Sequence, residues 1–184
     1  MYLPGAMHAP RSYALYESLG EDALTMVSGS AYFSVLSPGA RLRPHCGPTN
    51  VRLRVHIGLS IPTVRRAPDR TSMAPDRTSA GRPVAGMRVG NETRAWREGE
   101  ALVFNDSFEH EVWNEGTTPR LVFIYDVWHP ELRTDAQRLG AYTDAAGQQA
   151  QAMRYRAVVE ALRSGRGLPH EPDLVADRRE RTVY

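Results

Sequence analysis

His45 and His110 are the two histidines whose surroundings first suggest metal chemistry. Non-haem iron oxygenases hold Fe(II) with two imidazoles and one carboxylate, and leave positions open for a co-substrate and O₂. The usual sequence form is His-x-Asp on one strand and a distant histidine on another. Here the third residue of that motif is Gly47, so the carboxylate is missing. Taken alone, such a histidine pair is more often structural than metal-binding.

Arginines supply a second possible chemistry, the binding of carboxylates. A guanidinium group is a planar fork that matches the two oxygens of a carboxylate. Arg120 follows His110 by ten residues, at the head of a strand-like run, and could anchor such a group. The alternative for Arg120 is an ordinary solvated strand end.

Arg52, Arg54 and His56 share one face of a predicted strand, because they alternate with apolar residues along residues 51–57. If solvent covers that face, the arginines are ordinary surface residues. If a barrel encloses it, they need anionic partners, since an unpaired buried charge is costly. Carboxylates of bound molecules would supply those partners. The periodicity leaves both possibilities open.

Short strand-like runs separated by proline and glycine must position these residues. The predicted strands are Tyr32–Leu36, Leu42–His45, Val51–Ile61, Val84–Val89, Ala101–Phe104, His110–Asn114 and Leu121–Trp128. No helical period lies between them, which favours an all-β barrel or a double-sheet jelly roll. We therefore predict a mainly β fold, a cupin-like jelly roll, with flanking helices.

The helices are predicted on both sides of this β region. Residues 11–27 are interpreted as a helical or mixed segment, and Ala145–Ser164 as an amphipathic helix that could brace the sheet or a partner subunit in a homodimer. The predicted regions are an N-terminal segment 1–30, a core 31–132 and a C-terminal helical extension 133–184.

A biased insert at residues 63–83 interrupts the predicted core. It contains a near-perfect tandem repeat, residues 67–72 and 74–79, rich in Pro, Ser, Asp and Arg. Such a composition cannot bury a core, so we expect a flexible surface excursion. An inert duplication is favoured over a lid.

Composition limits the classes of function. The chain has 184 residues, enough for one domain with a hydrophobic core, and a net charge of +2 that gives no reason to expect nucleic acid or membrane partners. The lone Cys46 excludes an intramolecular disulfide and fits a reducing compartment. Without a membrane-length apolar run or a secretory signal, we expect a cytoplasmic protein.

The stretch Ser34–Leu132 resembles the aspartyl/asparaginyl β-hydroxylase family, a branch of the 2-oxoglutarate oxygenases with a double-stranded β-helix fold. The segments that carry the resemblance are Pro44–Asn50, Arg52–Leu59, Asn91–Thr93, Trp96–Gly99, Phe104–Trp113 and Asp126–Leu132. The run Ser107–Trp113 is the most specific of them. That family lacks the iron-binding carboxylate and has glycine there, so Gly47 agrees with the resemblance.

The resemblance implies roles for seven residues. The Fe(II) ligands would be His45 and His110, the 2-oxoglutarate contacts Ser34, Arg54, His56 and Arg120, and the substrate contact Arg52. Ser34 and Arg120 would hold the distal carboxylate of 2-oxoglutarate, and Arg54 and His56 the carboxylate near iron. Arg52 would pair with an acidic group of the substrate.

The function implied is that of an Fe(II)- and 2-oxoglutarate-dependent dioxygenase. It would hydroxylate the β-carbon of an aspartate- or asparagine-like amino acid, free, carrier-bound or in a peptide, and release succinate and CO₂. Two alternatives stay open. The vacant iron position could take chloride and give a halogenase, or the protein could be a cupin-like binding or sensor protein without turnover.

Overall fold

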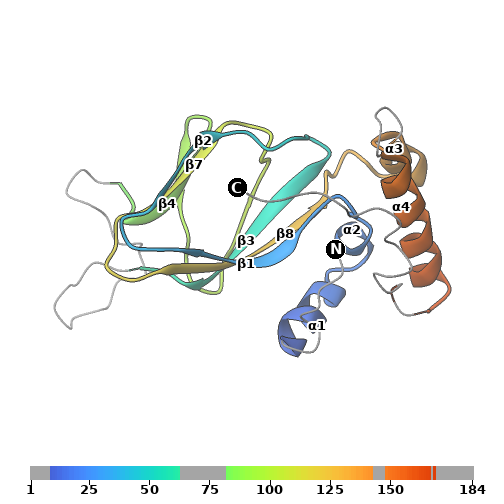
Figure 1. The fold of residues 1–184 in the computed structure, drawn as a ribbon, viewed down its shortest axis with the longest axis horizontal. Coiled ribbons are helices and arrows are strands. Elements are labelled where there is room, and N and C mark those ends of the chain that lie inside the picture. The colour runs from blue at the N-terminus through green and yellow to red at the C-terminus, as the bar shows by residue number, and fades with distance from the viewer. Residues whose placement is uncertain (1–8, 63–81, 143–147, 167, 169–184) are drawn as a thin grey trace. The chain divides into compact units, whose positions relative to one another are not determined.

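The computed structural model describes residues 9–62, 82–142, 148–166 and 168 (Figure 1). Most of the predicted insert, residues 63–81, therefore lies outside the described residues. Contacts divide the chain into two compact units. One is Ala31–His129, and the other combines Met1–Ser30 with Pro130–Tyr184.

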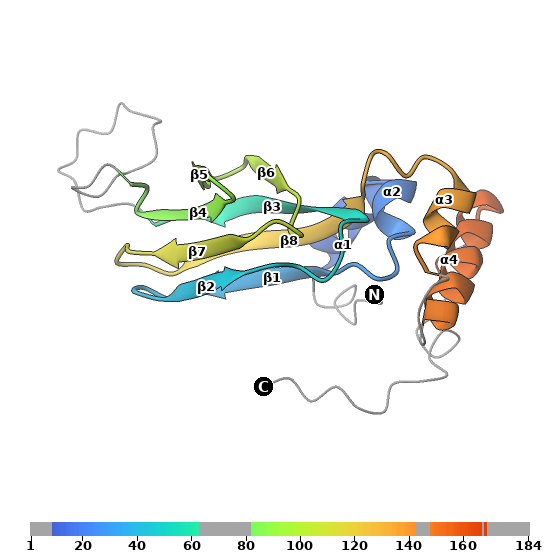
Figure 2. The ribbon, with the colours of Figure 1, turned by 90° about the horizontal axis from the view of Figure 1, so that it is seen from above.

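Two antiparallel four-stranded sheets make up the unit Ala31–His129 (Figures 1 and 2). The strands are β1 (Ala31–Leu36), β2 (Arg41–His45), β3 (Arg52–Ser60), β4 (Ala85–Val89), β5 (Glu92–Ala95), β6 (Ala101–Phe104), β7 (His110–Asn114) and β8 (Arg120–Trp128). The strand orders are β1-β8-β3-β6 and β2-β7-β4-β5. Successive strands alternate between the two sheets, except for the hairpin β4–β5, which lies within the second sheet. This arrangement is that of a jelly roll, and the predicted mainly β fold is confirmed.

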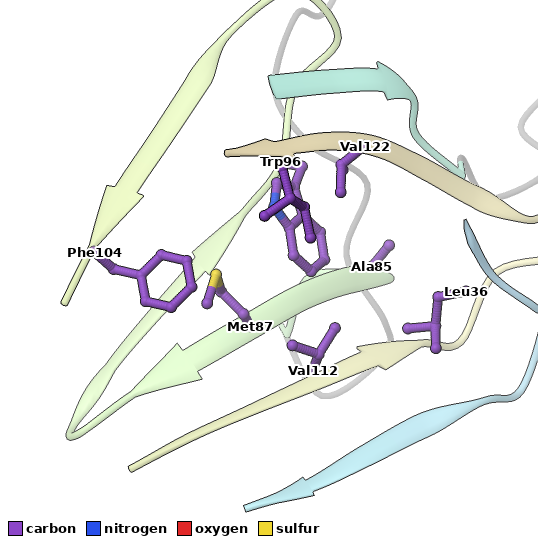
Figure 3. Packing of buried hydrophobic residues seen from close by; sticks show 8 residues of the cluster. Leu36, Ala85, Met87, Trp96, Phe104, Val112 and Val122 are labelled. Atoms are coloured by element: carbon purple, nitrogen blue, oxygen red, sulfur yellow. The ribbon is translucent and has the colours of Figure 1, made fainter. Parts of the chain in front are cut away.

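The hydrophobic core lies between the inner faces of the two sheets (Figure 3). Its buried members are Leu36, Ala85, Met87, Trp96, Phe104, Val112, Val122 and Ile124. Because side chains alternate along a strand, the residues two positions from these core members also point inward. In this way the core fixes the direction of the polar side chains that share its face.

Seven of the strands overlap the predicted runs, and β5 was not predicted. Its sequence, Glu-Thr-Arg-Ala, is short and polar, and three of its four residues are exposed. A four-residue edge strand without apolar alternation gives no period-two signal. Its pairing with β4, from Gly86↔Ala95 to Val89↔Glu92, is what extends the second sheet.

The other unit contains the helices α1 (Pro10–Ser18), α2 (Glu21–Leu24), α3 (Asp135–Gly140) and α4 (Gln148–Arg163). α3 begins with a capping box in which Thr134 and Gln137 satisfy each other's backbone N–H groups. α4 corresponds to the predicted C-terminal helix. Among the helices of the described residues, none is long and apolar enough to cross a membrane.

Candidate metal and co-substrate site

The two candidate metal ligands lie side by side. His45 ends β2 and His110 begins β7, and the two residues are Cα partners across these strands. Their ring centroids are 4.2 Å apart, with the ring planes inclined by 52°. A break in the β2–β7 register between Leu42 and His45 precedes this pair. The fold therefore brings together two imidazoles that are 65 positions apart in the chain.

Backbone carbonyls orient both imidazoles in the same way. Nδ1 of His45 lies 2.7 Å from the carbonyl oxygen of Arg43, and Nδ1 of His110 lies 2.9 Å from that of Phe108. A carbonyl oxygen only accepts, so each Nδ1 carries a proton, and in the neutral form of each ring the lone pair is on Nε2. Burial lowers the pKa of His110, which favours the neutral ring. A neutral imidazole with its lone pair on Nε2 is the form that binds a metal ion.

A third protein ligand is not assembled beside this pair. In the part of the chain that the structure describes, no cluster of three or more His, Cys, Asp or Glu side chains is placed to hold a metal ion. The imidazole pair therefore fits iron only in a two-histidine site, with other positions left to small molecules.

Asp106 occupies the space beside Gly47. A Cβ atom built on Gly47 would lie 2.5 Å from Cγ of Asp106, and the backbone N–H of Gly47 donates to the Asp106 carbonyl at 2.6 Å. Asp106 is fully buried. The glycine thus leaves room for a carboxylate that comes from another part of the chain.

This close approach predicts a cost for any side chain at position 47. Gly47→Ala should lower the free energy of unfolding by about 1–3 kcal/mol, because the Asp106 carboxyl group has to move. Urea unfolding measures the change. Gly140→Ala is the matched control, since a Cβ there meets nothing within 4 Å, and it should be neutral or slightly stabilising. Equal effects of the two substitutions would contradict the crowding.

Two arginines and two aspartates form a network of ion pairs with little exposure to solvent. Arg52 contacts Asp106 at 2.8 Å and Asp126 at 3.2 Å. Arg54 contacts Asp126 at 2.8 Å and Asp106 at 3.3 Å. The barrel therefore encloses the polar face of β3, and the chain itself supplies the anionic partners. The four formal charges cancel, which offsets the cost of burying them.

Arg120 differs from these two arginines because no carboxylate of the described residues forms an ion pair with it. It is 2% exposed, and Nη2 donates to Oγ of Ser34 at 3.4 Å. Its Nε and Nη1 atoms are buried and have no hydrogen-bond partner in the described structure. Burial lowers its pKa to about 10, and the nearby Tyr32 raises it. A buried guanidinium with free donors is expensive unless an anion binds it.

Burial and nearby basic groups determine the protonation state of His56. This residue is 5% exposed, and its Nδ1 is 3.3 Å from the indole nitrogen of Trp96. Its Nε2 is buried and has no hydrogen-bond partner among the described residues. Burial lowers the pKa of His56 to about 3, with further lowering by Arg120, Arg54 and His110. His56 is therefore neutral at physiological pH.

The lowered pKa of His56 predicts a pH dependence of stability. The unfolded chain takes up a proton near pH 6.5 and the folded chain only near pH 3, so stability is lost as pH falls between these values. Going from pH 7 to pH 5, the wild type should lose about 2 kcal/mol more than His56→Gln. Urea unfolding of both proteins at the two pH values measures the difference. Parallel losses would show that His56 is not the responsible group.

All seven residues predicted to form the site lie in the unit Ala31–His129. The structure places His45 against His110 and Ser34 against Arg120, and puts Arg52, Arg54 and His56 on one inner face of β3. It adds three residues that received no role from the sequence, namely Trp96, Asp106 and Asp126. The sequence contains a signal for Asp126, because it is the acidic residue inside the otherwise apolar run Leu121–Trp128. Nothing in the periodicity indicated Asp106.

The fold and site together define a jelly-roll protein with a pair of adjacent histidines and a buried arginine, Arg120, beside Ser34. The family model of the aspartyl/asparaginyl β-hydroxylases matches residues 4–130. The chain belongs to this family, as its resemblance predicted.

Relatives support this assignment. The chain is 42% identical over 130 residues to the mouse aspartyl/asparaginyl β-hydroxylase, covering 71% of this chain and 15% of the relative. It is 38% identical over 126 residues to human aspartate β-hydroxylase domain-containing protein 2, covering 67% of this chain and 29% of that protein. The chain thus spans less than a third of the length of either relative.

Among solved structures, similar chains include a cupin protein from Bacteroides fragilis. That comparison has a TM-score of 0.40 at 12% identity, and covers 65% of this chain and 78% of the other. A predicted oxalate decarboxylase from Thermotoga maritima gives a TM-score of 0.39 at 11% identity, covering 61% and 73%.

Proposed function

We propose that the chain is an Fe(II)- and 2-oxoglutarate-dependent hydroxylase that acts on the β-carbon of an aspartate- or asparagine-like residue. The observation that carries the proposal is the environment of Arg120. This residue has a buried guanidinium with two unpartnered donors, next to Ser34, in the same unit as the imidazole pair. Membership of the aspartyl/asparaginyl β-hydroxylase family supports the reaction class.

In the proposed complex, His45 and His110 hold the metal through Nε2, because their Nδ1 protons are committed to backbone carbonyls. Bound Fe(II) would supply the oxidising chemistry with O₂ and 2-oxoglutarate. The protein contributes two neutral ligands and leaves the carboxylate position of the usual triad to Gly47. Two protein ligands would leave more of a bound Fe(II) ion open to co-substrate and O₂ than three would.

The 2-oxoglutarate contacts follow from the unpartnered donors. Arg120 and Ser34 would hold the distal carboxylate, and the Nε2–H of His56 would donate to the carboxylate nearer the metal. Arg54 would assist there, since its side chain is 17% exposed. Binding of 2-oxoglutarate would pair the charge of Arg120 and give its free N–H donors an acceptor. An anion should therefore be held more tightly than a neutral molecule.

Arg52 is proposed as the contact for the acidic group of the substrate. Its side chain is 7% exposed and bonded to Asp106 and Asp126. In the proposed complex, the substrate therefore competes with these two carboxylates for the guanidinium group. This competition would select acids or amides of matching shape rather than any anion.

Peptides and free amino acids that contain Asp or Asn test the proposal. The protein, Fe(II), 2-oxoglutarate and O₂ are incubated with each candidate, and succinate and the mass of the candidate are measured. We expect succinate release that depends on the candidate, with one added oxygen atom on Asp or Asn. Incorporation of chlorine would indicate a halogenase instead. Absence of succinate with every candidate, although iron and 2-oxoglutarate bind, would favour a binding or sensor protein.

A further inference from the structure

Trp96 contacts both His56 and Arg120, the two residues that form the proposed co-substrate cage. It follows β5, is 1% exposed, and lies in the hydrophobic core (Figure 3). Its indole N–H donates to Nδ1 of His56 at 3.3 Å, and the two rings are nearly parallel, with centroids 5.9 Å apart and planes inclined by 15°. The guanidinium carbon of Arg120 lies 4.8 Å from the centre of the same ring.

The indole determines which nitrogen of His56 carries a proton. An indole N–H can only donate, so Nδ1 of His56 must accept and must be unprotonated. The proton of the neutral ring is then on Nε2, which is buried and has no partner. His56 therefore presents an Nε2–H donor to the interior. His45 and His110 differ, because their protons are on Nδ1, which faces a backbone carbonyl.

The free polar atoms of the cage are all donors. They are Nε2 of His56 and the Nε and Nη1 atoms of Arg120, the buried side-chain atoms of the described residues that lack a hydrogen-bond partner. A bound molecule can supply the acceptors that the described residues do not, and carboxylate oxygens are the acceptors that suit a guanidinium. With the opposite tautomer, the lone pair of His56 Nε2 would repel the same carboxylate.

We infer that Trp96 is a positioning residue that sets His56 as the Nε2–H tautomer and holds the Arg120 guanidinium against its ring. The donors for both carboxylates of 2-oxoglutarate are then fixed before it binds, which reduces the cost of binding. The inference rests on the proposed function for its ligand. Trp96 itself touches neither co-substrate nor substrate in this account.

Trp113 provides a matched control. It is also 1% exposed, its indole N–H also donates to a protein acceptor, the Pro83 carbonyl at 2.8 Å, and Arg82 lies 4.4 Å from its ring centre. It lies on β7, and no contact of its own joins it to His56 or Arg120 among the described interactions. A substitution there reproduces the packing and hydrogen-bond loss without touching the cage.

The experiment compares Trp96→Phe, Trp96→Leu and Trp113→Phe with the wild type. Imidazole ¹⁵N shifts report the tautomer of His56, whose signal is identified by its loss in His56→Gln. Calorimetric titration with 2-oxoglutarate, with Mn²⁺ in place of Fe²⁺ to prevent turnover, gives its affinity. We expect Nε2–H in the wild type and mixed tautomers in Trp96→Phe, with about tenfold weaker binding. Trp96→Leu, which also removes the ring under Arg120, should bind more weakly still.

Trp113→Phe should keep wild-type tautomer and affinity even if it lowers thermal stability. A wild-type His56 protonated on Nδ1 would overturn the inference, even if no Trp96 variant folds. So would unchanged affinity in Trp96→Phe. A wild type that has the Nε2–H tautomer but does not bind 2-oxoglutarate would instead refute the proposed function and leave the tautomer assignment standing.

Discussion

Arg120→Met should abolish 2-oxoglutarate binding and at the same time make the protein more stable. The guanidinium is 2% exposed and has two donors without partners, so in the absence of an anion it is a net cost to the fold. Methionine fills similar space without charge. We expect the free energy of unfolding to rise by about 1–3 kcal/mol, measured by urea unfolding without ligand.

The same variant tests the proposed division of roles. Iron affinity should stay near the wild-type value, because Arg120 is not proposed as a metal ligand. Arg120→Ala should likewise lose 2-oxoglutarate binding but keep iron binding. Arg94→Met is the control, since the Arg94 side chain is 64% exposed and pairs with Glu92 at the surface. An Arg120→Met protein that is less stable and still binds 2-oxoglutarate would contradict the cage.

His110→Ala should remove the metal. One imidazole alone offers a single protein ligand, so we expect Fe(II) affinity to fall by about a hundredfold or more. Equilibrium dialysis under anaerobic conditions gives the affinity. The substitution should also free His45 of its partner ring, which now lies 4.2 Å away.

His129→Ala serves as the comparison for the His110 substitution, because His129 is a histidine of the same unit with no role in the site. It should bind Fe(II) like the wild type. If both variants keep wild-type affinity, then the imidazole pair is not the metal site. If both lose it, the loss reflects damage to the fold rather than removal of a ligand, and thermal unfolding would show this.

Most of the fold could be predicted because the strands that face the core alternate. Along β3, residues 52–58 alternate in character, and the structure places Arg52, Arg54 and His56 on one face, opposite Trp128, Asp126 and Ile124 of β8. β5 could not be predicted, because a short polar edge strand is defined by its partner β4 and not by its own pattern.

The site could be predicted only in part, for a related reason. The resemblance indicated which residues to consider, but pairing between residues distant in sequence decides their partners. The arginines of β3 are neutralised by Asp106 and Asp126, 54 and 72 positions away from Arg52 and Arg54, respectively. No local pattern encodes these partners. That two donor atoms of Arg120, Nε and Nη1, lack a hydrogen-bond partner among the described residues likewise depends on pairing between distant parts of the chain.

The absorption spectrum of the anaerobic complex tests the central proposal most directly. The protein is loaded with Fe(II) and titrated with 2-oxoglutarate in the absence of O₂. If the paired imidazoles hold iron and the Arg120 cage holds the co-substrate, a visible metal-to-ligand charge-transfer band should appear and saturate in the wild type. It should be absent in His110→Ala and Arg120→Met. A wild type that binds iron but shows no band at any 2-oxoglutarate concentration would contradict the proposal.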